Sequence, residues 1–165
     1  MAETVTGLAL DLKIIGQVVG DDNCRLLIDE QMVTNFSDGT GTNQIGTVWQ
    51  DLTRSLAATS EDHDFAGSRT DFQGAAIAGT AIKFIFIRNL STTAGQTVKL
   101  KPGSSNPVTG ILGGTSPTLT IGPGGFALLS NPIDGYTVTG GSADTIAIET
   151  SATSSYRIIV GLDNT

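Results

Sequence analysis

Residues 80–90, with the sequence TAIKFIFIRNL, constrain the fold more than any other stretch, because they form the longest run of β-branched and aromatic residues. Alternate side chains of a strand point to opposite faces. This gives the segment two apolar faces, one with Ile82, Phe84 and Phe86 and the other with Ile85 and Ile87. A strand that is apolar on both faces has to be covered on both. We therefore predict that this segment lies in the middle of a β structure.

The chain before residue 45 predicts two further strands. Residues 8–15 alternate between aliphatic and mostly polar side chains, which is the period of a half-buried strand. Residues 20–23 (GDDN) form a cluster of turn formers. Residues 25–36 predict a second strand, although the spacing of their aliphatic residues would also fit one or two helical turns. Residues 37–41 (SDGTG) then indicate a closing turn.

The next part of the chain has a weaker pattern. Leu52 and Leu56 lie four residues apart, which suits a helix, but the apolar residues before them do not continue that stripe. We expect residues 45–58 to form a strand that runs into an irregular arm. We expect residues 59–67 (TSEDHDFAG) to form a polar loop.

Beyond residue 90 short apolar alternations are separated by Gly, Pro, Asn and Asp. Such strands, about 8–12 residues apart, are typical of a sandwich or barrel. The predicted strands are 97–101, 118–121, 126–130, 136–139, 143–150 and 156–162. Counted over both halves of the chain, the better-defined strands number about eight, as in a jelly roll. We therefore predict one all-β domain, a jelly-roll-like β-sandwich. Residues 1–75 would supply N-terminal strands and a less regular arm packed on it, and residues 76–165 its regular portion.

Charge and cysteine content limit the classes of function. The net charge of −7 and the nine scattered basic residues argue against binding to nucleic acid phosphates. We find neither a stretch apolar enough to span a membrane nor a secretion signal, and expect synthesis in the cytoplasm. The one cysteine, Cys24, allows no disulfide within the chain, and we expect it to be buried.

The strongest candidate for chemistry is the run 61–64 (EDHD), which holds the only histidine, His63, among three carboxylates. Carboxylates can bind a hard cation, and a His–carboxylate pair can transfer protons. Consecutive side chains of an extended chain diverge, however, and no second His or Cys completes a zinc site. We favour a solvated loop or an intersubunit contact, with no catalytic residue, metal or cofactor.

Other residues between 49 and 71 suggest an interface between subunits. Asp51, Arg54, Arg69 and Asp71 could form ion pairs with a neighbour or remain solvated. Trp49 and Phe65 are apolar anchors, either of the core or of a subunit interface. The predicted interface set is Trp49, Asp51, Arg54, Asp62, His63, Asp64, Phe65, Arg69 and Asp71.

Two groups of segments resemble a known family. The first group is Asp51–Ala58, Glu61–Gly67 and Thr70–Gly74; the second is Ile85–Asn89, Pro123–Gly125, Gly135–Tyr136, Ala143–Thr145 and Tyr156–Gly161. Together they resemble small structural proteins of tailed bacteriophage virions, of the type that decorates or cements capsids. The resemblance implies a jelly-roll-like β-sandwich on the capsid surface. Its partners would be the major capsid protein of the same virion and further copies of itself, as a homodimer or homotrimer.

The sequence thus predicts a non-enzymatic capsid decoration protein that bridges major capsid subunits. The alternative is a tail or fibre component, or a β-sandwich module that binds a host-surface glycan. Sugar sites usually expose aromatic rings, and aromatic residues make up only 5% of this chain. This composition favours the structural function over the glycan-binding one.

Overall fold

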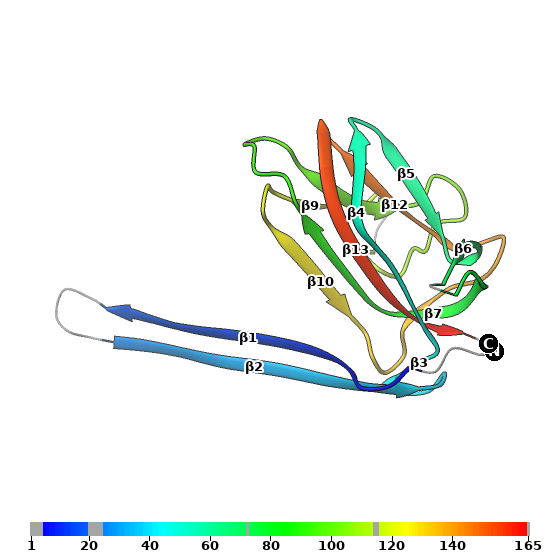
Figure 1. Cartoon of the computed structure of the whole chain (residues 1–165), viewed down its shortest axis with the longest axis horizontal. Coiled ribbons are helices and arrows are strands. Elements are labelled where there is room, and N and C mark those ends of the chain that lie inside the picture. The colour runs from blue at the N-terminus through cyan, green and yellow to red at the C-terminus, as the bar shows by residue number, and fades with distance from the viewer. Residues whose placement is uncertain (1–4, 20–24, 72, 114–115, 165) are drawn as a thin grey trace.

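The protein is a sandwich of two β-sheets from which a long two-stranded hairpin projects (Figure 1). The computed structural model describes residues 5–19, 25–71, 73–113 and 116–164. The predicted turn at 20–23 and Cys24 lie outside these residues. None of the described residues forms a helix that could cross a membrane.

The first sheet has the strand order β10-β7-β13-β4, and neighbouring strands are antiparallel. Its strands are β4 (Thr47–Ala57), β7 (Ala76–Asn89), β10 (Phe126–Ser130) and β13 (Thr153–Asn164). Two short strands, β6 (Ala66–Thr70) and β11 (Tyr136–Thr137), pair with the beginning of β7. The predicted central position of β7 is confirmed, because it lies between β10 and β13.

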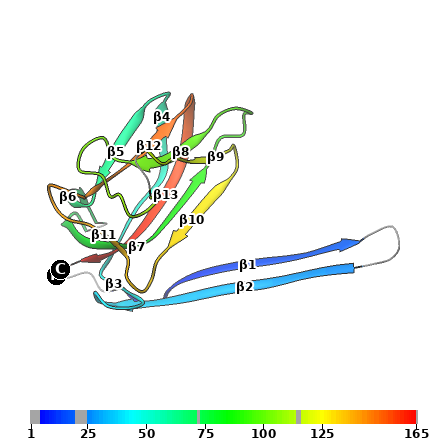
Figure 2. The same cartoon turned by 180° about the vertical axis from the view of Figure 1, so that it is seen from behind.

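The second sheet has the order β5-β12-β8-β9 and lies behind the first, as Figure 2 shows from the opposite side. Its strands are β5 (Ser60–Asp64), β8 (Val98–Pro102), β9 (Leu119–Ile121) and β12 (Thr145–Thr150). The chain crosses repeatedly between the two sheets: β4 lies in the first, β5 in the second, β7 in the first, and β8 and β9 in the second. It then returns to the first sheet with β10, crosses to the second with β12 and ends in the first with β13. This is the strand order of a jelly roll, and the predicted all-β sandwich is confirmed.

The core lies between the sheets and is made of their alternating inward side chains. Ile85 and Ile87 on β7 face inward with Ile158 and Val160 on β13, and all four are fully buried or nearly so. Ile82 belongs to the same core, whereas we predicted it on the opposite face with Phe84. The prediction is wrong because the pairing of β7 with β13 shifts by one residue at Lys83, a β-bulge that reverses the alternation.

Two predictions for residues 45–67 also need correction. The irregular arm expected within residues 45–58 is the continuous strand β4. The polar loop expected at residues 59–67 contains β5, an edge strand of the second sheet. Its polar composition is misleading because its inward side chains, Glu61 and His63, are themselves polar. The sandwich therefore takes in strands that lie before residue 75.

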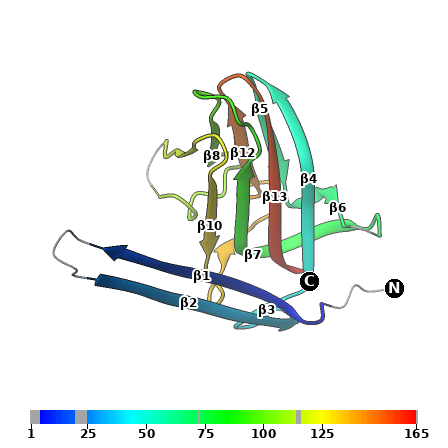
Figure 3. The same cartoon turned by 60° about the vertical axis from the view of Figure 1, so that its left-hand side comes forward.

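The projecting hairpin consists of β1 (Leu8–Val19) and β2 (Arg25–Asp38). From here on the word arm means this hairpin and not the irregular segment predicted within residues 45–58. The two strands pair antiparallel from Leu8 opposite Phe36 to Val19 opposite Arg25, so both predicted strands are confirmed and extend further than expected. The short strand β3 (Gln44–Ile45) joins the end of β2 in parallel. In Figures 1 and 3 the arm passes beneath the first sheet and extends well past β10.

The root of the arm is fixed to the body by a second, smaller core. Phe36 on β2 and Phe84 on the outer face of β7 are both buried, and their ring centroids lie 5.7 Å apart. Leu8, Leu10 and the outer-face residue Leu128 pack around them. The first sheet is thus covered on both faces here, as the two apolar faces of β7 require.

Candidate functional site

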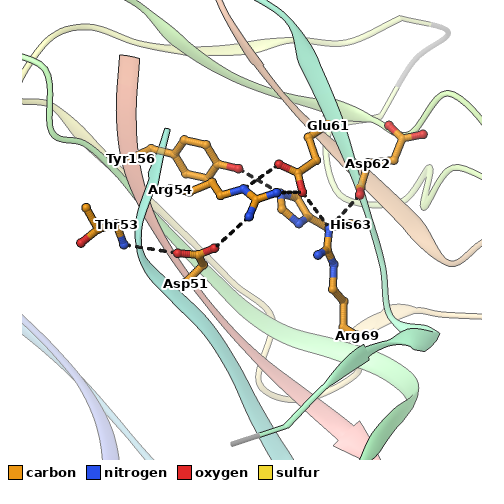
Figure 4. Close-up of polar contacts among 8 residues, drawn as sticks. All are labelled: Asp51, Thr53, Arg54, Glu61, Asp62, His63, Arg69 and Tyr156. Carbon is orange, nitrogen blue, oxygen red and sulfur yellow. Dashed lines mark hydrogen bonds and ion pairs between the residues drawn. The ribbon is translucent and has the colours of Figure 1, made fainter. Parts of the chain in front are cut away.

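A cluster of polar side chains closes the edge of the sandwich where β4 and β5 meet (Figure 4). Arg54 on β4 donates hydrogen bonds to both carboxylate oxygens of Glu61 on β5, at 2.8 Å from Nε and 2.6 Å from Nη2. This bidentate geometry is the strong form of an arginine–carboxylate contact. Asp51 lies at 3.9 Å on the other side of the same guanidinium. We call Asp51, Arg54, Glu61, His63, Arg69 and Tyr156 the edge cluster.

Arg69 brings β6 into the edge cluster. Its Nη2 donates to Glu61 Oε1 at 3.2 Å and to the backbone carbonyl of Asp62 at 2.9 Å. Its guanidinium carbon also lies 5.4 Å from the centroid of the Trp49 ring, within the range of a cation–π contact. Glu61 therefore accepts from two arginines on different strands, and its ion pairs hold three strands together.

His63 lies beneath these charges, inside the sandwich. It is 1% exposed, its ring centroid lies 5.1 Å from that of Trp49, and its Nε2 lies 3.1 Å from the hydroxyl oxygen of Tyr156. Its Nδ1 has no hydrogen-bond partner within the described part of the chain. Burial, and next the positive charges of Arg69 and Arg54, lower the pKa of His63 to about 4. The imidazole is therefore neutral at pH 7.

Glu61 and Tyr156 are held in their ordinary charge states. Burial acts to raise the pKa of Glu61, but the hydrogen bond from Arg54, the charge that His63 carries when acid protonates it and the hydrogen bond from Arg69 outweigh burial and lower the pKa. Burial, and then the charge of Glu61, raise the pKa of the Tyr156 hydroxyl. At neutral pH the edge cluster thus contains a carboxylate between two guanidinium groups and a neutral His–Tyr pair.

The run 61–64 does not gather its side chains at one point. Glu61 and His63 stand opposite Ile148 and Ile146 on β12 and share the inner face. Asp62 accepts hydrogen bonds from the backbone N–H and the hydroxyl of Ser104, and Asp64 accepts from Ser68. Within the described ranges, no three His, Cys, Asp or Glu side chains are placed to hold a metal ion.

The structure separates the predicted interface set into two groups. Trp49, His63 and Phe65 lie in the core of this chain, with Trp49 and Phe65 in edge-to-face contact at 5.5 Å between centroids. The remaining members are partly exposed: Asp51, Arg54, Asp62, Asp64, Arg69 and Asp71. Arg69 pairs with Glu61, while Asp71 accepts the backbone N–H groups of residues 73 and 75 in a turn.

The arm carries a surface that the sequence-based interface set does not include. In the register of β1 with β2, Leu12 stands opposite Met32 and Ile14 opposite Glu30 on the face that also holds Leu8 and Phe36. Phe36 is buried at the root, but Ile14 is 51% and Met32 is 59% exposed. The aliphatic alternation of residues 8–14 predicts this apolar face, but no sequence pattern predicts that the face extends beyond the body.

A second surface feature is a hollow of about 740 Å³ on the outer face of the second sheet. Its lining includes Lys99 and Lys101 on β8, both of which form ion pairs with Glu149 on β12 at 3.0 and 2.6 Å. Asp62 on β5 and Ser104 complete its polar wall. None of the described residues that line the hollow is aromatic.

Comparison with known proteins gives no relatives: no family model, no curated protein and no solved structure matches this chain.

Proposed function

We propose that this chain is a non-enzymatic structural protein of a bacteriophage virion that decorates or cements the capsid shell by bridging major capsid subunits. The observation that carries the proposal is the arm. Its root is anchored on a jelly-roll body, while its far part presents Ile14 and Met32 to solvent. An exposed apolar surface of this kind is typical of a protein interaction site.

The division into a body and an arm suits a bridging protein. The body has its own core, so it folds without a shell beneath it, and the arm can reach a surface that the body does not touch. Jelly-roll sandwiches are also a recurrent architecture of viral capsid proteins, which agrees with the family resemblance of residues 51–161. Fold alone does not define function, so the arm and not the sandwich is the main support.

The test is the copy number of the chain in purified particles of the phage that encodes it, measured by quantitative mass spectrometry against the major shell subunit. A copy number comparable with that of the shell subunit is expected for a decoration protein. Particles that lack the chain should also release their genome at a lower temperature than complete particles. A handful of copies would place the chain in the tail, and its absence from the particle would refute the proposal.

The hollow on the second sheet supports the second candidate, a tail or fibre module that binds a host-surface glycan. Lysine, carboxylate and hydroxyl groups around a concave surface can bond to sugar hydroxyls, and lectins share the jelly-roll architecture. Glycan-array binding that is lost in Glu149→Gln and retained in Glu61→Gln would favour this candidate. Binding that is equal in both variants, or no binding, would count against it.

A further inference from the structure

We propose that the apolar face of the arm binds the outer face of the first sheet in a second copy of this chain, and that the two copies do so reciprocally. This inference goes beyond the proposed function, because it concerns self-association and needs no shell. It rests on two exposed surfaces of the same molecule, which match each other in apolar character and in charge.

The first surface is the far part of the arm. Leu12 and Met32 form one cross-strand pair of the apolar face, and Ile14 and Glu30 form the next. Leu12 is half-buried, whereas Ile14 and Met32 are more than half exposed. Among the residues whose side chains the structure describes, the face is therefore an apolar stripe that also contains one carboxylate, Glu30.

The root of the same face shows what kind of surface it fits. There Phe36 packs on Phe84, and the small core that contains them is covered by Leu8 and Leu10 from the arm and by Val48 from the first sheet. Within one molecule, then, the arm face already binds a row of this sheet. Its far part extends past β10, where none of the labelled strands of the body lies alongside it (Figures 1 and 3).

The second surface is the part of that sheet face beyond the root of the arm. Phe86 stands opposite Leu128 and close to Phe126, at 6.1 Å between the rings of the two phenylalanines. Phe126 at the β10 edge is 57% exposed and Leu52 at the β4 edge is 43% exposed. The rows of side chains that contain these residues continue the row that the root of the arm covers. The arm of a second copy could therefore lie on this sheet face beside the first arm.

Charge also matches between the two surfaces. Arg88 on β7 and Arg157 on β13 stand opposite each other, in the outer row that also contains Phe126. Glu30 is the carboxylate at the end of the described apolar stripe on the arm. An arm laid across the sheet of a second copy places this carboxylate toward a pair of guanidinium groups. Each copy offers one arm and one sheet face, and in the proposed dimer a two-fold axis repeats the contact so that both are used.

The test is the mass of the purified full chain in solution, by sedimentation equilibrium from micromolar concentrations to 100 µM. The wild-type chain is expected at twice its mass of 17.0 kDa. Met32→Glu should weaken association by about tenfold or more, because it puts a charge at the centre of the contact. Val33→Glu is the matched control: Val33 is 50% exposed on the opposite face of the same strand, so dimerisation should not change.

Mixing and charge reversal test the pairing of the two surfaces. Phe126→Glu alone should weaken association as Met32→Glu does. A mixture of the two variants should associate more tightly than either alone, since one arm and one sheet face remain intact. Glu30→Arg should weaken association, and adding Arg88→Glu should restore it, whereas Gln31→Arg on the other face should have no effect.

Three results would overturn the proposal. One is a monomeric wild-type chain at 100 µM, which would leave the arm for a different protein such as a shell subunit. Another is an equal effect of Met32→Glu and Val33→Glu. The third is a mixture of the Met32 and Phe126 variants that associates no better than its components.

Discussion

Arg54 and Glu61 join the edge strands of the two sheets through two hydrogen bonds of 2.8 and 2.6 Å. The pair spans only seven residues of sequence, yet β4 and β5 belong to different sheets. Because Arg69 also donates to Glu61, the removal of one negative charge leaves two guanidinium groups without their partner. Glu61 is therefore the charged member of the edge cluster whose neutralisation should cost the most.

We expect Glu61→Gln to lower the free energy of unfolding by about 1–2 kcal/mol, a figure reduced by the partial exposure of Arg54. The measurement is equilibrium unfolding in urea at pH 7. Glu149→Gln is the matched control, because Glu149 also accepts from two cations but on the open outer face. Its cost should stay below about 1 kcal/mol, and equal costs for the two variants would contradict the prediction.

Stability should fall as the solution is acidified from pH 6.5 toward pH 4 because of His63. Its pKa is about 4 in the folded chain and near 6.5 in the unfolded chain. Between these values the unfolded state binds more protons, so the free energy of unfolding rises with pH, by up to about 1.4 kcal/mol per pH unit. Unfolding in urea at pH 7, 6 and 5 measures this slope.

His63→Gln should flatten that slope between pH 5 and 6.5, whatever its effect on stability at pH 7. The chain has one histidine, so its proton NMR signal can also be followed directly. A midpoint near pH 6.5 in the folded protein would show that burial does not keep His63 neutral.

Breaking the ion pair between Lys83 and Asp163 should destabilise the fold strongly. Their charged atoms lie 3.3 Å apart, the side chains are 2% and 7% exposed, and Lys83 also donates to the carbonyl of Ile133. Burial outweighs the attraction of Lys83 and raises the pKa of Asp163. Lys83→Met or Asp163→Asn should each cost about 3–5 kcal/mol, because each leaves one buried charge unpaired. The double variant should cost less than the sum, and additive costs in urea unfolding would show that the two groups are not coupled.

Gly161→Ala should loosen the root of the arm. A Cβ at position 161 would lie 2.2 Å from the ring of Phe84, which in turn contacts Phe36. We expect a loss of about 1–3 kcal/mol and faster hydrogen exchange in β2 near Phe36. The control is Gly122→Ala, where a Cβ meets no atom within 4 Å and the change should stay within about 0.5 kcal/mol. Unchanged exchange in β2 for Gly161→Ala would refute this link.

The sequence predicted the strands well where one face is apolar and the other polar. Val98 and Leu100 on β8 are buried as expected, and so are Ile146 and Ile148 on β12. Both faces of β7 were recognised as apolar, but the bulge at Lys83 was not, since a bulge follows from pairing with a distant strand.

The edge cluster was predicted only in part, for a different reason. The run 61–64 attracted attention for its composition, but β5 was taken for a loop because its inward residues are charged or polar. Glu61 is missing from the predicted interface set, and nothing in the sequence connects Tyr156 with His63, which lies 93 residues away. Contacts of this kind depend on which edge strands meet, and no local pattern records that.

The pairing of β4 with β13 affects the order in which parts of the chain can fold during synthesis. Thr47 stands opposite Leu162, so the first sheet cannot close until nearly the whole sequence has left the ribosome. The two paired strands of the arm lie within residues 8–38. At about 5–20 residues per second, synthesis of the remaining residues takes roughly 6–25 seconds. During that interval the apolar face of the hairpin has no sheet of its own to rest on. Neighbouring nascent chains on one messenger would then make their first contacts through their arms. Chaperones that bind exposed apolar segments would act on this hairpin before the sandwich has formed.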